Sequence, residues 1–313
     1  MPDQPNILVV GSINMDLILR CPSMPTPGET VLGDGFRTAP GGKGANQAVA
    51  AARLGARCTL IGRIGEDAFG EELLANLRAE GVDCRDVLGT SEAPSGVAAI
   101  LVDGNGENTI VVAGGANRCL TPDDLFAREA LFRDADAVLL QLELPLPTVR
   151  AAIDLARRHG CLTVLDPAPA PRRPVAGLFE VDVLSPNASE AELLTGIPTG
   201  DQHANKNVAS ELIARGARAA VLKLGSRGSL VVSADGEMAR VGPYKVTITD
   251  TTAAGDAFTA ALGVSLSRGS ALRVAARYAN AAGALASTRI GSQSAMPTAD
   301  EVAMLMADQA PEP

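Results

Sequence analysis

The stretch from 250 to 258 combines residue types that suit the handling of an anion. Two alanines and a glycine precede Asp256, so the backbone there can come close to a ligand. A small-residue helix is predicted to begin in this stretch and to run to about Arg268. The first turn of a helix carries unpaired N–H groups and the positive end of the helix dipole. Asp256 could therefore act as a general base beside a bound anion, or it could simply cap the helix.

A second glycine-rich turn, Gly41 to Gly44, leads into another predicted helix. It is not a Walker A phosphate loop, because that motif has Ser or Thr after its lysine and Gly six residues before it. This chain has Gly44 and Arg37 at those positions. Lys43 and Asn46 could instead hold a polyhydroxylated ligand through amine, amide and backbone donors. The alternative is a tight connection with a solvated lysine.

Polar residues also follow several predicted strands. Asn14 and Asp16 come after the apolar run at 7–10, and Glu143 follows the strand predicted at 137–142. Asn187 and Glu190 open a helix with the spacing of a capping box, and the residues alone favour that interpretation. The alternative is that these two residues order Mg²⁺ through water beside nucleotide phosphates.

The turn from Lys223 to Gly228 connects two predicted strands. Its glycines allow close approach to a flat ring or a phosphate, and Lys223 supplies positive charge, although a plain hairpin turn would have the same composition. In open α/β sheets the carboxyl ends of the strands form the ligand-binding edge. All these polar groups are therefore predicted to face one crevice, and helix capping alone does not account for that convergence.

Other kinds of chemistry are disfavoured by what the chain lacks. The two histidines, His159 and His203, have neither triad nor metal-ligand spacing, and there is no GxGxxG motif. The formal net charge of −9 argues against nucleic-acid or anionic-membrane binding, because both require a basic face.

The cysteines indicate a reducing compartment. Cys21, Cys58, Cys84, Cys119 and Cys161 are scattered and odd in number, which fits reduced thiols better than disulfides or a zinc site. Residues 1–6 lack the features of a signal peptide, and no apolar run reaches the roughly 18 residues needed to span a bilayer. A cytoplasmic location is expected.

The order of predicted elements positions these residues. Strands are predicted at 7–10, 58–61, 137–142, 162–165, 181–184, 219–224, 229–232 and 244–249, and helices at 67–80, 147–159, 204–215, 256–268, 272–287 and 299–307. This alternation predicts a parallel sheet covered on both faces, in one large domain or two smaller ones. The β-rich segments at 17–39 and 96–112 interrupt it and could pair into a small sheet that acts as a lid.

Several motifs in this order resemble the PfkB carbohydrate kinase family, most closely its ribokinase branch. They are Gly-Ser-Ile-Asn-Met-Asp (11–16), Pro-Gly-Glu-Thr-Val (27–31), Gly-Gly-Lys-Gly-Ala-Asn-Gln-Ala (41–48), Gln-Leu-Glu (141–143), Pro-Ala-Pro-Ala (167–170), Asn-x-x-Glu (187–190), Leu-Gly-Ser-Arg-Gly (224–228) and Asp-Thr-x-x-Ala-Gly-Asp (250–256). The last is specific to the superfamily, while the first and third indicate the branch.

The resemblance implies a ribokinase-like three-layer α/β/α fold with a mostly parallel central sheet. It implies a single domain over 1–313, with a β lid formed by about 15–39 and 95–113 that often pairs with a second lid in a homodimer. The implied reaction is ATP-dependent phosphorylation of D-ribose at O5. The alternatives are 2-deoxyribose, fructose or adenosine as acceptor, or a non-catalytic sugar-binding protein. Phosphoryl transfer needs positioning and charge stabilisation rather than a protein nucleophile, so the scarcity of histidine is no obstacle.

The resemblance also implies roles for individual residues. Asp256 would be the general base, and the backbone of Ala253, Ala254, Gly255 and Asp256 would form an anion hole. Sugar binding is implied for Asn14, Met15, Asp16, Gly42, Lys43, Gly44, Ala45, Asn46, Glu143 and Asp256. ATP binding is implied for Asn187, Lys223, Leu224, Gly225, Ser226, Arg227, Gly228, Gly255, Asp256 and Asn280. Glu190 would place Mg²⁺ or another divalent cation through water, and K⁺ as an activator would lie at Asp250, Thr252, Ala286, Arg289, Gly291 and Ala295.

Overall fold

The computed structural model describes residues 4–173 and 175–309, so residues 1–3, part of the segment used for the signal-peptide prediction, lie outside the described residues. Within these ranges the main body is built on a nine-stranded sheet. Its strands are β1 Asn6–Val10, β4 Arg57–Gly65, β5 Val87–Thr90, β8 Ala137–Leu140, β9 Leu162–Leu165, β10 Val183–Leu184, β11 Ala219–Lys223, β12 Ser229–Ser233 and β13 Met238–Val241. Their spatial order is β13-β12-β11-β10-β9-β8-β1-β4-β5. The pairs from β5 to β11 are parallel, and β12 and β13 add an antiparallel edge.

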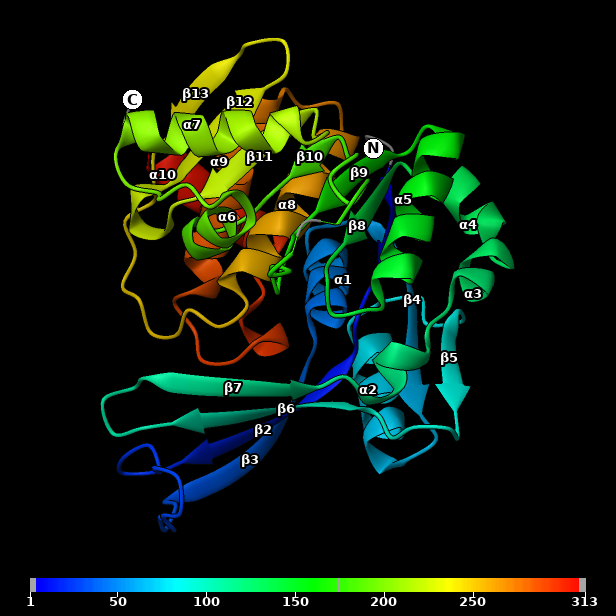
Figure 1. Cartoon of the computed structure of the whole chain (residues 1–313), viewed down its shortest axis with the longest axis vertical. Helices are drawn as coiled ribbons and strands as arrows, with labels where there is room; N and C mark the ends of the chain where they lie inside the picture. Colours follow the sequence, from blue (N-terminus) through cyan, green and yellow to red (C-terminus); the bar gives the residue numbers. More distant parts are fainter. Residues whose placement is uncertain (1–3, 174, 310–313) are drawn as a thin grey trace.

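Helices cover both faces of this sheet (Figure 1), as a parallel sheet requires. One face packs on α1 Lys43–Arg53, α2 Ala68–Ala79, α8 Ala254–Ser267, α9 Leu272–Ala286 and α10 Ala299–Asp308. The other packs on α3 Pro122–Phe126, α4 Glu129–Arg133, α5 Leu146–His159, α6 Ala188–Thr195 and α7 Gln202–Ala214. Among the described residues, 3₁₀ turns lie at Gly115–Cys119 (η1), Gly225–Arg227 (η2) and Gln293–Ala295 (η3). This is the predicted three-layer arrangement.

The order of the strands reverses at β1. From β1 the chain first adds β4 and β5 on one side, and it later returns to add β8, β9, β10 and β11 on the other side. The carboxyl end of a strand at such a reversal is the usual ligand crevice of an open α/β sheet. In this protein β1 ends at Val10, directly before the polar segment that contains Asn14 and Asp16.

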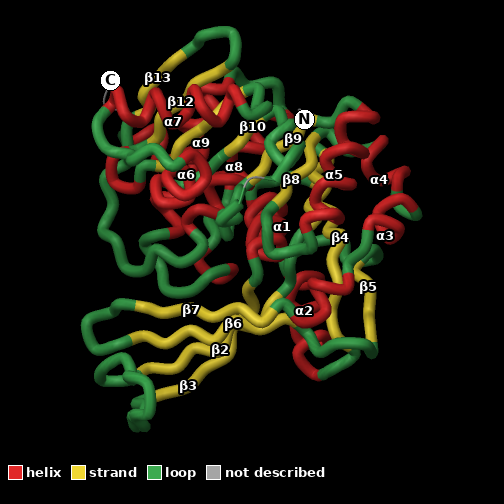
Figure 2. Tube along the Cα trace, in the orientation of Figure 1, coloured by secondary structure: helices red, strands yellow, loops and turns green. Residues whose placement is uncertain are grey.

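A second, four-stranded sheet extends from the carboxyl end of β1 and forms the predicted lid (Figures 1 and 2). Its order is β3-β2-β6-β7, with β2 Asn14–Arg20, β3 Gly35–Gly41, β6 Gly96–Val102 and β7 Asn108–Ala113. The two predicted hairpins pair through their first strands, β2 and β6, which run parallel to each other. Because β2 begins at Asn14, the polar residues after β1 belong to the first strand of the lid.

One predicted strand is wrong, and two strands were not predicted. Tyr244 to Thr249 alternates like a strand but is irregular, and the edge strand is β13 instead. Pro243 cannot donate a backbone hydrogen bond, so the ladder is not continued beyond Val241. The strand β5 was not predicted either, because its four residues carry little alternation.

Two further observations bear on the predictions from composition. All five cysteines are free, four of them buried and Cys119 partly buried. In the described part of the chain, no helix is long and apolar enough to cross a bilayer.

Candidate active site

Asp256 lies in the first turn of α8 and does not cap the helix. The N-cap is Ala253, whose φ of 58° makes it the only non-glycine residue with a positive φ in the described part of the chain. No side chain accepts a hydrogen bond from the first turn there, although the Ala254 N–H donates to Thr251 O (3.3 Å). The next two N–H groups, of Gly255 and Asp256, occupy positions that lack intrahelical acceptors. A helix start with backbone donors is therefore present beside the carboxylate.

The Asp256 carboxylate is buried and held by the helix that follows the glycine turn. Asn46 Nδ2 donates to Asp256 Oδ2 (2.9 Å), and Gln47 Nε2 donates to Oδ1 (3.4 Å). The residue is only 3% exposed. Burial raises the pKa of Asp256, Asp166 and Glu143 raise it further, and Lys43 and Asn46 partly offset the rise. A carboxylate with a raised pKa at a ligand crevice suits a general base.

Lys43 provides the compensating positive charge. Burial alone would lower the pKa of Lys43, but the carboxylates of Asp256, Asp166, Glu143 and Glu190 outweigh burial and hold the pKa above its ordinary value. The ammonium group is therefore charged at any physiological pH. It is the shared counter-charge of a cluster of acids contributed by several elements.

Glu143 accepts several hydrogen bonds at the start of the lid. Its Oε2 accepts hydrogen bonds from Ser12 Oγ (2.6 Å), Asn14 Nδ2 (3.2 Å) and Lys43 N (3.4 Å). Asn14 is fixed from its other side, because Asn117 Nδ2 donates to Asn14 Oδ1 (2.7 Å). The Asn46 Oδ1 atom is buried and has no hydrogen-bond partner. Such an orphaned acceptor is costly unless a ligand donor satisfies it.

Asp16 lies on the same face of β2 as Asn14, where Gly41 makes room for it. A Cβ built on Gly41 would lie 2.3 Å from Asp16 Oδ2. Burial, Glu143 and Asp256 raise the pKa of Asp16 to about 7, and Arg37 opposes the rise. Met15 points the other way, as strand alternation requires, and its side chain is fully buried in the core. Only the backbone of Met15 is left to meet a ligand.

The glycine turn packs directly against the segment that leaves β1. A Cβ on Gly42, whose φ is 87°, would lie 2.6 Å from Asn14 N. Gly44 and Ala45 are buried at the start of α1, where Ala45 N donates to Ser12 O (2.9 Å). The turn and the first lid strand are thereby held together.

A cavity of about 520 Å³ opens on the other side of α8. Its walls include seven of the residues implied in ATP binding or in the anion hole: Lys223, Gly225, Ser226, Gly228, Ala254, Gly255 and Asn280. Asn280 Nδ2 donates to Val241 O (3.2 Å) and Gly242 O (3.0 Å), so the N–H donors of its side-chain amide are already used. Tyr244, Ile248 and Phe258 supply apolar wall. The size and mixed lining suit a heterocyclic ligand.

Four residues implied in ATP binding do not line this cavity: Asp256, described above, and Leu224, Arg227 and Asn187. Leu224 and Arg227 line a neighbouring hollow of about 160 Å³, and Asn187 forms the capping box favoured from its spacing. Asn187 Oδ1 accepts from Glu190 N (2.8 Å), and Glu190 Oε2 accepts from Asn187 N (2.7 Å). Burial raises the pKa of Glu190, and Lys223 opposes that rise.

Asp166 is a site residue that the sequence analysis did not single out. Its Oδ1 accepts from Lys223 Nζ (2.8 Å), and its Oδ2 accepts from Gln47 Nε2 (3.4 Å). The residue is 1% exposed. It follows β9 directly, so the same strand-end signal that indicated Asn14 could have found it. Ser12, Gln47 and Gln141 lie inside the quoted motifs but received no role of their own, and Asn117 was missed altogether.

The residues implied in K⁺ binding lie on two connected segments. Asp250 Oδ1 accepts from Thr252 N (2.9 Å) and Thr252 Oγ1 (2.6 Å), and Asp250 Oδ2 accepts from Gly291 N (3.0 Å). Burial alone would raise the pKa of Asp250, but these hydrogen bonds outweigh burial and hold it below its ordinary value. The Arg289 guanidinium forms an ion pair with Glu301. Only the backbone of Arg289 therefore remains for a role in the loop. Ala286 ends α9 and Ala295 ends η3.

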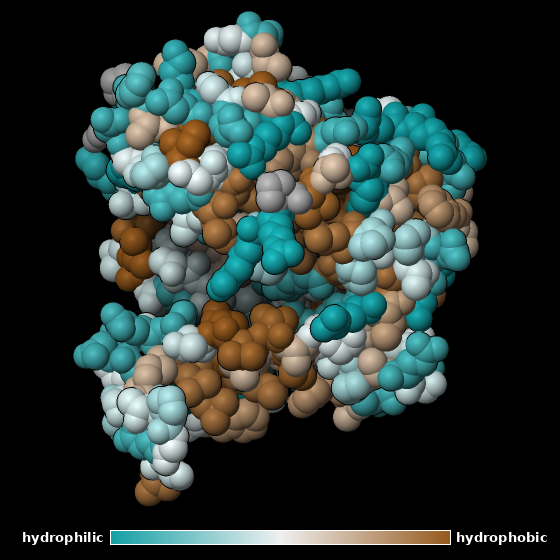
Figure 3. All heavy atoms as spheres, in the orientation of Figure 1, coloured by the Kyte–Doolittle hydropathy of each residue, from teal (hydrophilic) through white to brown (hydrophobic). Residues whose placement is uncertain are grey.

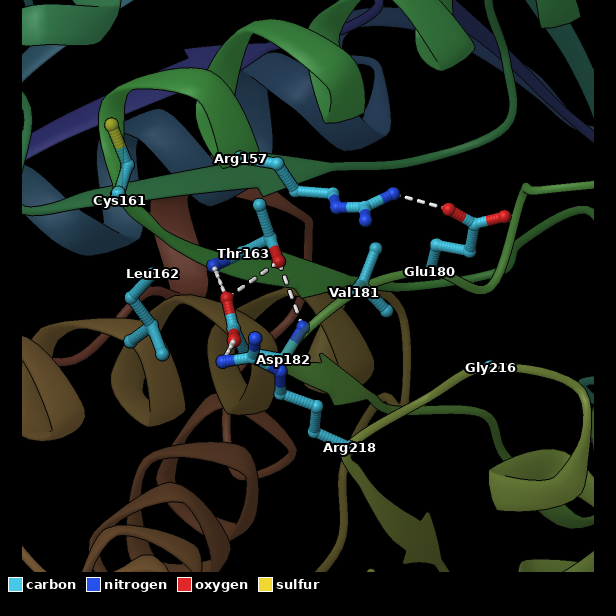
Figure 4. A pocket seen from close by; sticks show the side chains of 10 residues that line it. Arg157, Cys161, Leu162, Thr163, Glu180, Val181, Asp182, Gly216 and Arg218 are labelled. Atoms are coloured by element: carbon cyan, nitrogen blue, oxygen red, sulfur yellow. Dashed lines mark hydrogen bonds and ion pairs between the residues drawn. The ribbon is translucent and has the colours of Figure 1, made fainter.

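A larger cavity, of about 670 Å³, lies at the opposite edge of the sheet (Figure 4). Its charged groups satisfy one another: Arg157 pairs with Glu180, and Arg218 pairs with Asp182. Asp182 Oδ2 also accepts from Thr163 N and Oγ1, both at 2.8 Å. Since these groups are already paired and lie at the amino ends of strands, we place the candidate site at the crevice around Asp256.

The pattern described as pfkB family carbohydrate kinase matches residues 4–299. The chain is 38% identical to a ribokinase of Haemophilus influenzae over 295 residues, covering 94% of this chain and 96% of that protein. It is 39% identical to a bifunctional ribokinase/ribose-5-phosphate isomerase A of Fructilactobacillus sanfranciscensis over 298 residues, 95% of this chain, and spans 55% of that longer protein.

A solved structure of Arabidopsis thaliana ribokinase complexed with ribose and ATP superposes with a TM-score of 0.90 at 32% identity. The match covers 97% of this chain and 99% of that chain. The resemblance noted from the motifs therefore extends over nearly the whole fold.

Proposed function

The chain belongs to the PfkB family of carbohydrate kinases, and on that premise we propose that it transfers the γ-phosphoryl group of ATP to O5 of D-ribose. The observation that carries this proposal is the buried Asp256 carboxylate. It is held by Asn46 and lies at the N-terminus of α8, between a polar crevice and the cavity that contains Lys223. The proposal is supported by the 38% identity to a ribokinase.

In the proposed reaction Asp256 accepts the proton of the ribose 5-hydroxyl as that oxygen attacks the γ-phosphorus. A new O–P bond forms, the bond from the γ-phosphorus to the bridging oxygen breaks, and ADP leaves. The backbone of residues 253–256 receives the charge of the moving phosphoryl group, with the N–H groups of Gly255 and Asp256 as the available donors. Lys43 favours the ionised form of the base and so partly offsets the rise in its pKa.

The sugar is proposed to lie between the lid and α1. The side chains of Asn14, Asp16 and Glu143 would bind its hydroxyl groups, together with the turn from Gly42 to Asn46. The orphaned Asn46 Oδ1 supports this placement, because a hydroxyl donor would satisfy it. Asp16 is buried and can accept from two hydroxyls when it is ionised, so an acceptor that lacks one of them would leave a buried carboxylate oxygen unpaired.

ATP is proposed to fill the cavity beside α8, with Lys223 near the phosphates and the base between Tyr244, Phe258 and Asn280. Because both Asn280 bonds to Val241 and Gly242 use its amide nitrogen, Oδ1 is left to accept from an exocyclic amine such as that of adenine. Leu224 and Arg227 would act through the backbone of the turn, since they line a different hollow.

Two cations complete the proposed site. Glu190 has one carboxylate oxygen in the capping box and a second left over, which suits water-mediated placement of Mg²⁺. Bound there, Mg²⁺ would neutralise charge on the phosphates. The oxygen-rich loops around Asp250, Thr252 and Gly291, joined by the Asp250 carboxylate, suit an alkali cation such as K⁺.

An acceptor panel tests the substrate. ADP release is measured with ATP, Mg²⁺ and K⁺ and with ribose, 2-deoxyribose, fructose or adenosine in turn. We expect D-ribose to have the highest kcat/KM. A clear preference for another acceptor would replace ribose within the same chemistry, and no acceptor-dependent ADP release together with sugar binding would favour a non-catalytic binding protein.

A homodimer through the lid is also proposed. The lid exposes several large apolar side chains: strand register places Leu19, Phe36 and Val111 on one face of the lid and Ile110 and Val112 on the other. Apolar residues gather on the part of the lid surface seen in Figure 3. Phe36 is 65% exposed and Val111 64% exposed. Sedimentation should show a dimer for the wild type and a monomer for Phe36→Asp. A wild type that sediments as a monomer at all concentrations would refute the proposal.

A further inference from the structure

Gln47 connects the two buried carboxylates of the site. The residue is fully buried. Its Nε2 lies 3.4 Å from Asp256 Oδ1 and 3.4 Å from Asp166 Oδ2, and its Oε1 accepts from Gln141 Nε2 at 2.6 Å. We infer that Gln47 is a positioning residue that keeps Asp256 ionised and oriented and links it to the Asp166–Lys223 ion pair. This inference rests on the proposed role of Asp256 as the base.

The orientation of the Gln47 amide is determined by its neighbours. An amide nitrogen has two hydrogens, and here each can meet one carboxylate. The reversed amide would place a carbonyl oxygen against two carboxylates and would turn its nitrogen toward the Gln141 donor. Only the observed orientation satisfies the three partners, so Gln47 presents donors alone to Asp256 and Asp166.

These donors oppose a repulsion built into the site. Asp166 is among the groups that raise the pKa of Asp256, as burial does. A hydrogen bond donated to a carboxylate stabilises its ionised form. Without Gln47 the repulsion between the negative charges of Asp166 and Asp256 would be less compensated. A proton on one of these carboxylates would then be harder to remove. The base would then be protonated over a wider pH range.

Gln47 also places the base next to the nucleotide side of the site. Asp166 Oδ1 accepts from Lys223 Nζ (2.8 Å), and Lys223 lines the cavity proposed for ATP. The connected groups therefore run from Lys223 through Asp166 and Gln47 to Asp256. Asn46 and Gln47 are adjacent on α1 and bind different oxygens of Asp256, which defines both the position and the rotation of the carboxylate.

The test is the pH profile of single-turnover phosphoryl transfer at saturating ATP and ribose, which isolates the chemical step. For Gln47→Leu we expect the acidic limb to move to higher pH by about one unit or more, because a hydrogen bond to the ionised base is lost. At high pH the rate should recover to within several-fold of the wild type, with both KM values changed less than about threefold.

A second variant and a control guard against a loss of folding. Gln47→Glu keeps the side-chain volume and adds a third acid, so its limb should move at least as far. Thr148→Val removes a fully buried hydrogen bond in α5, from Thr148 Oγ1 to Leu120 O (2.7 Å), and should leave the limb unchanged. Thermal unfolding of each variant shows which of them fold.

The outcomes separate this inference from the proposed function. An acidic limb that stays in place in the folded Gln47 variants, with a rate loss that is uniform across pH, would show a merely structural role and overturn the inference. If the wild type has no acidic limb, or if Asp256→Asn keeps full turnover, the assignment of the base fails first.

Discussion

The Asn46 side chain donates a 2.9 Å hydrogen bond to Asp256, although 210 positions separate the two residues. The bond joins the first turns of α1 and α8. These two helices pack closely because both contribute buried alanines to the same hydrophobic core. A small-residue interface allows two helix N-termini to approach. Ordinary core packing thus brings the proposed base next to the segment proposed to bind the sugar.

The first prediction concerns the ionisation of Asp16. Its pKa of about 7 lies far above its usual value of 3.8, so between about pH 4 and 7 the folded state binds more protons than the unfolded chain. The free energy of unfolding therefore falls as pH rises through this window. We expect Asp16→Asn to be more stable than the wild type by about 2–4 kcal/mol at pH 8, with the advantage shrinking toward pH 4.

Urea unfolding of both proteins at several pH values measures this difference. The same variant should raise the KM for ribose about tenfold or more, because a charged acceptor is replaced by a neutral amide. A stability difference that does not vary with pH would show that Asp16 ionises normally.

The second prediction uses a matched pair of glycines on β3. Gly41→Ala places a methyl group 2.3 Å from the Asp16 carboxylate and must displace it, whereas a Cβ on Gly35 meets nothing within 4 Å. We expect Gly41→Ala to raise the KM for ribose at least tenfold, and Gly35→Ala to change it less than twofold. Equal effects of the two substitutions in steady-state kinetics would show that the Asp16 position is not critical.

The third prediction separates nucleotide binding from stability at Lys223. Lys223→Met leaves the buried Asp166 without its ion-pair partner, so the variant should lose both stability and ATP affinity. Adding Asp166→Asn should restore much of the stability without restoring the affinity. Calorimetric titration with ATP and thermal unfolding measure the two effects. Recovery of ATP affinity in the double variant would mean that Lys223 serves only to neutralise Asp166.

The fourth prediction tests the alkali cation. At constant ionic strength, turnover in KCl should exceed turnover in NaCl several-fold. Asp250→Asn should weaken this preference, because Asp250 joins Thr252 to Gly291 through its carboxylate. Identical turnover of the wild type in the two salts would remove K⁺ from the proposal.

The parts of the fold and site that could be predicted depend on local signals. The buried run of β1, the helix start before Asp256 and the capping box of Asn187 are all encoded within a few residues. Tyr244 to Thr249 shows the limit of such signals: its residues alternate like a strand, but the sheet does not continue beyond Val241. Alternation indicates a preference for β structure, but a strand also needs a neighbouring strand with which to pair.

The connections between site residues could not be predicted, because they depend on contacts between distant segments. Gln47 meets Asp166 across 119 positions, and Asn117 meets Asn14 across 103. Gln47 lies in the motif at 41–48, but nothing in the sequence near Gln47 or Asn117 shows which side chains either residue contacts. Only the packed structure reveals which carboxylates they serve.

The central claim is that Asp256 takes the proton from O5 of ribose as ATP is consumed. Its most direct test is identification of the product by ³¹P NMR, with wild type and Asp256→Asn compared at equal concentration. The account predicts ribose 5-phosphate and ADP in equal amounts from the wild type. It predicts a rate lower by roughly 10²–10⁴-fold for the variant, with ribose binding retained in calorimetry. Unchanged turnover by Asp256→Asn, or no sugar phosphate from the wild type, would contradict it.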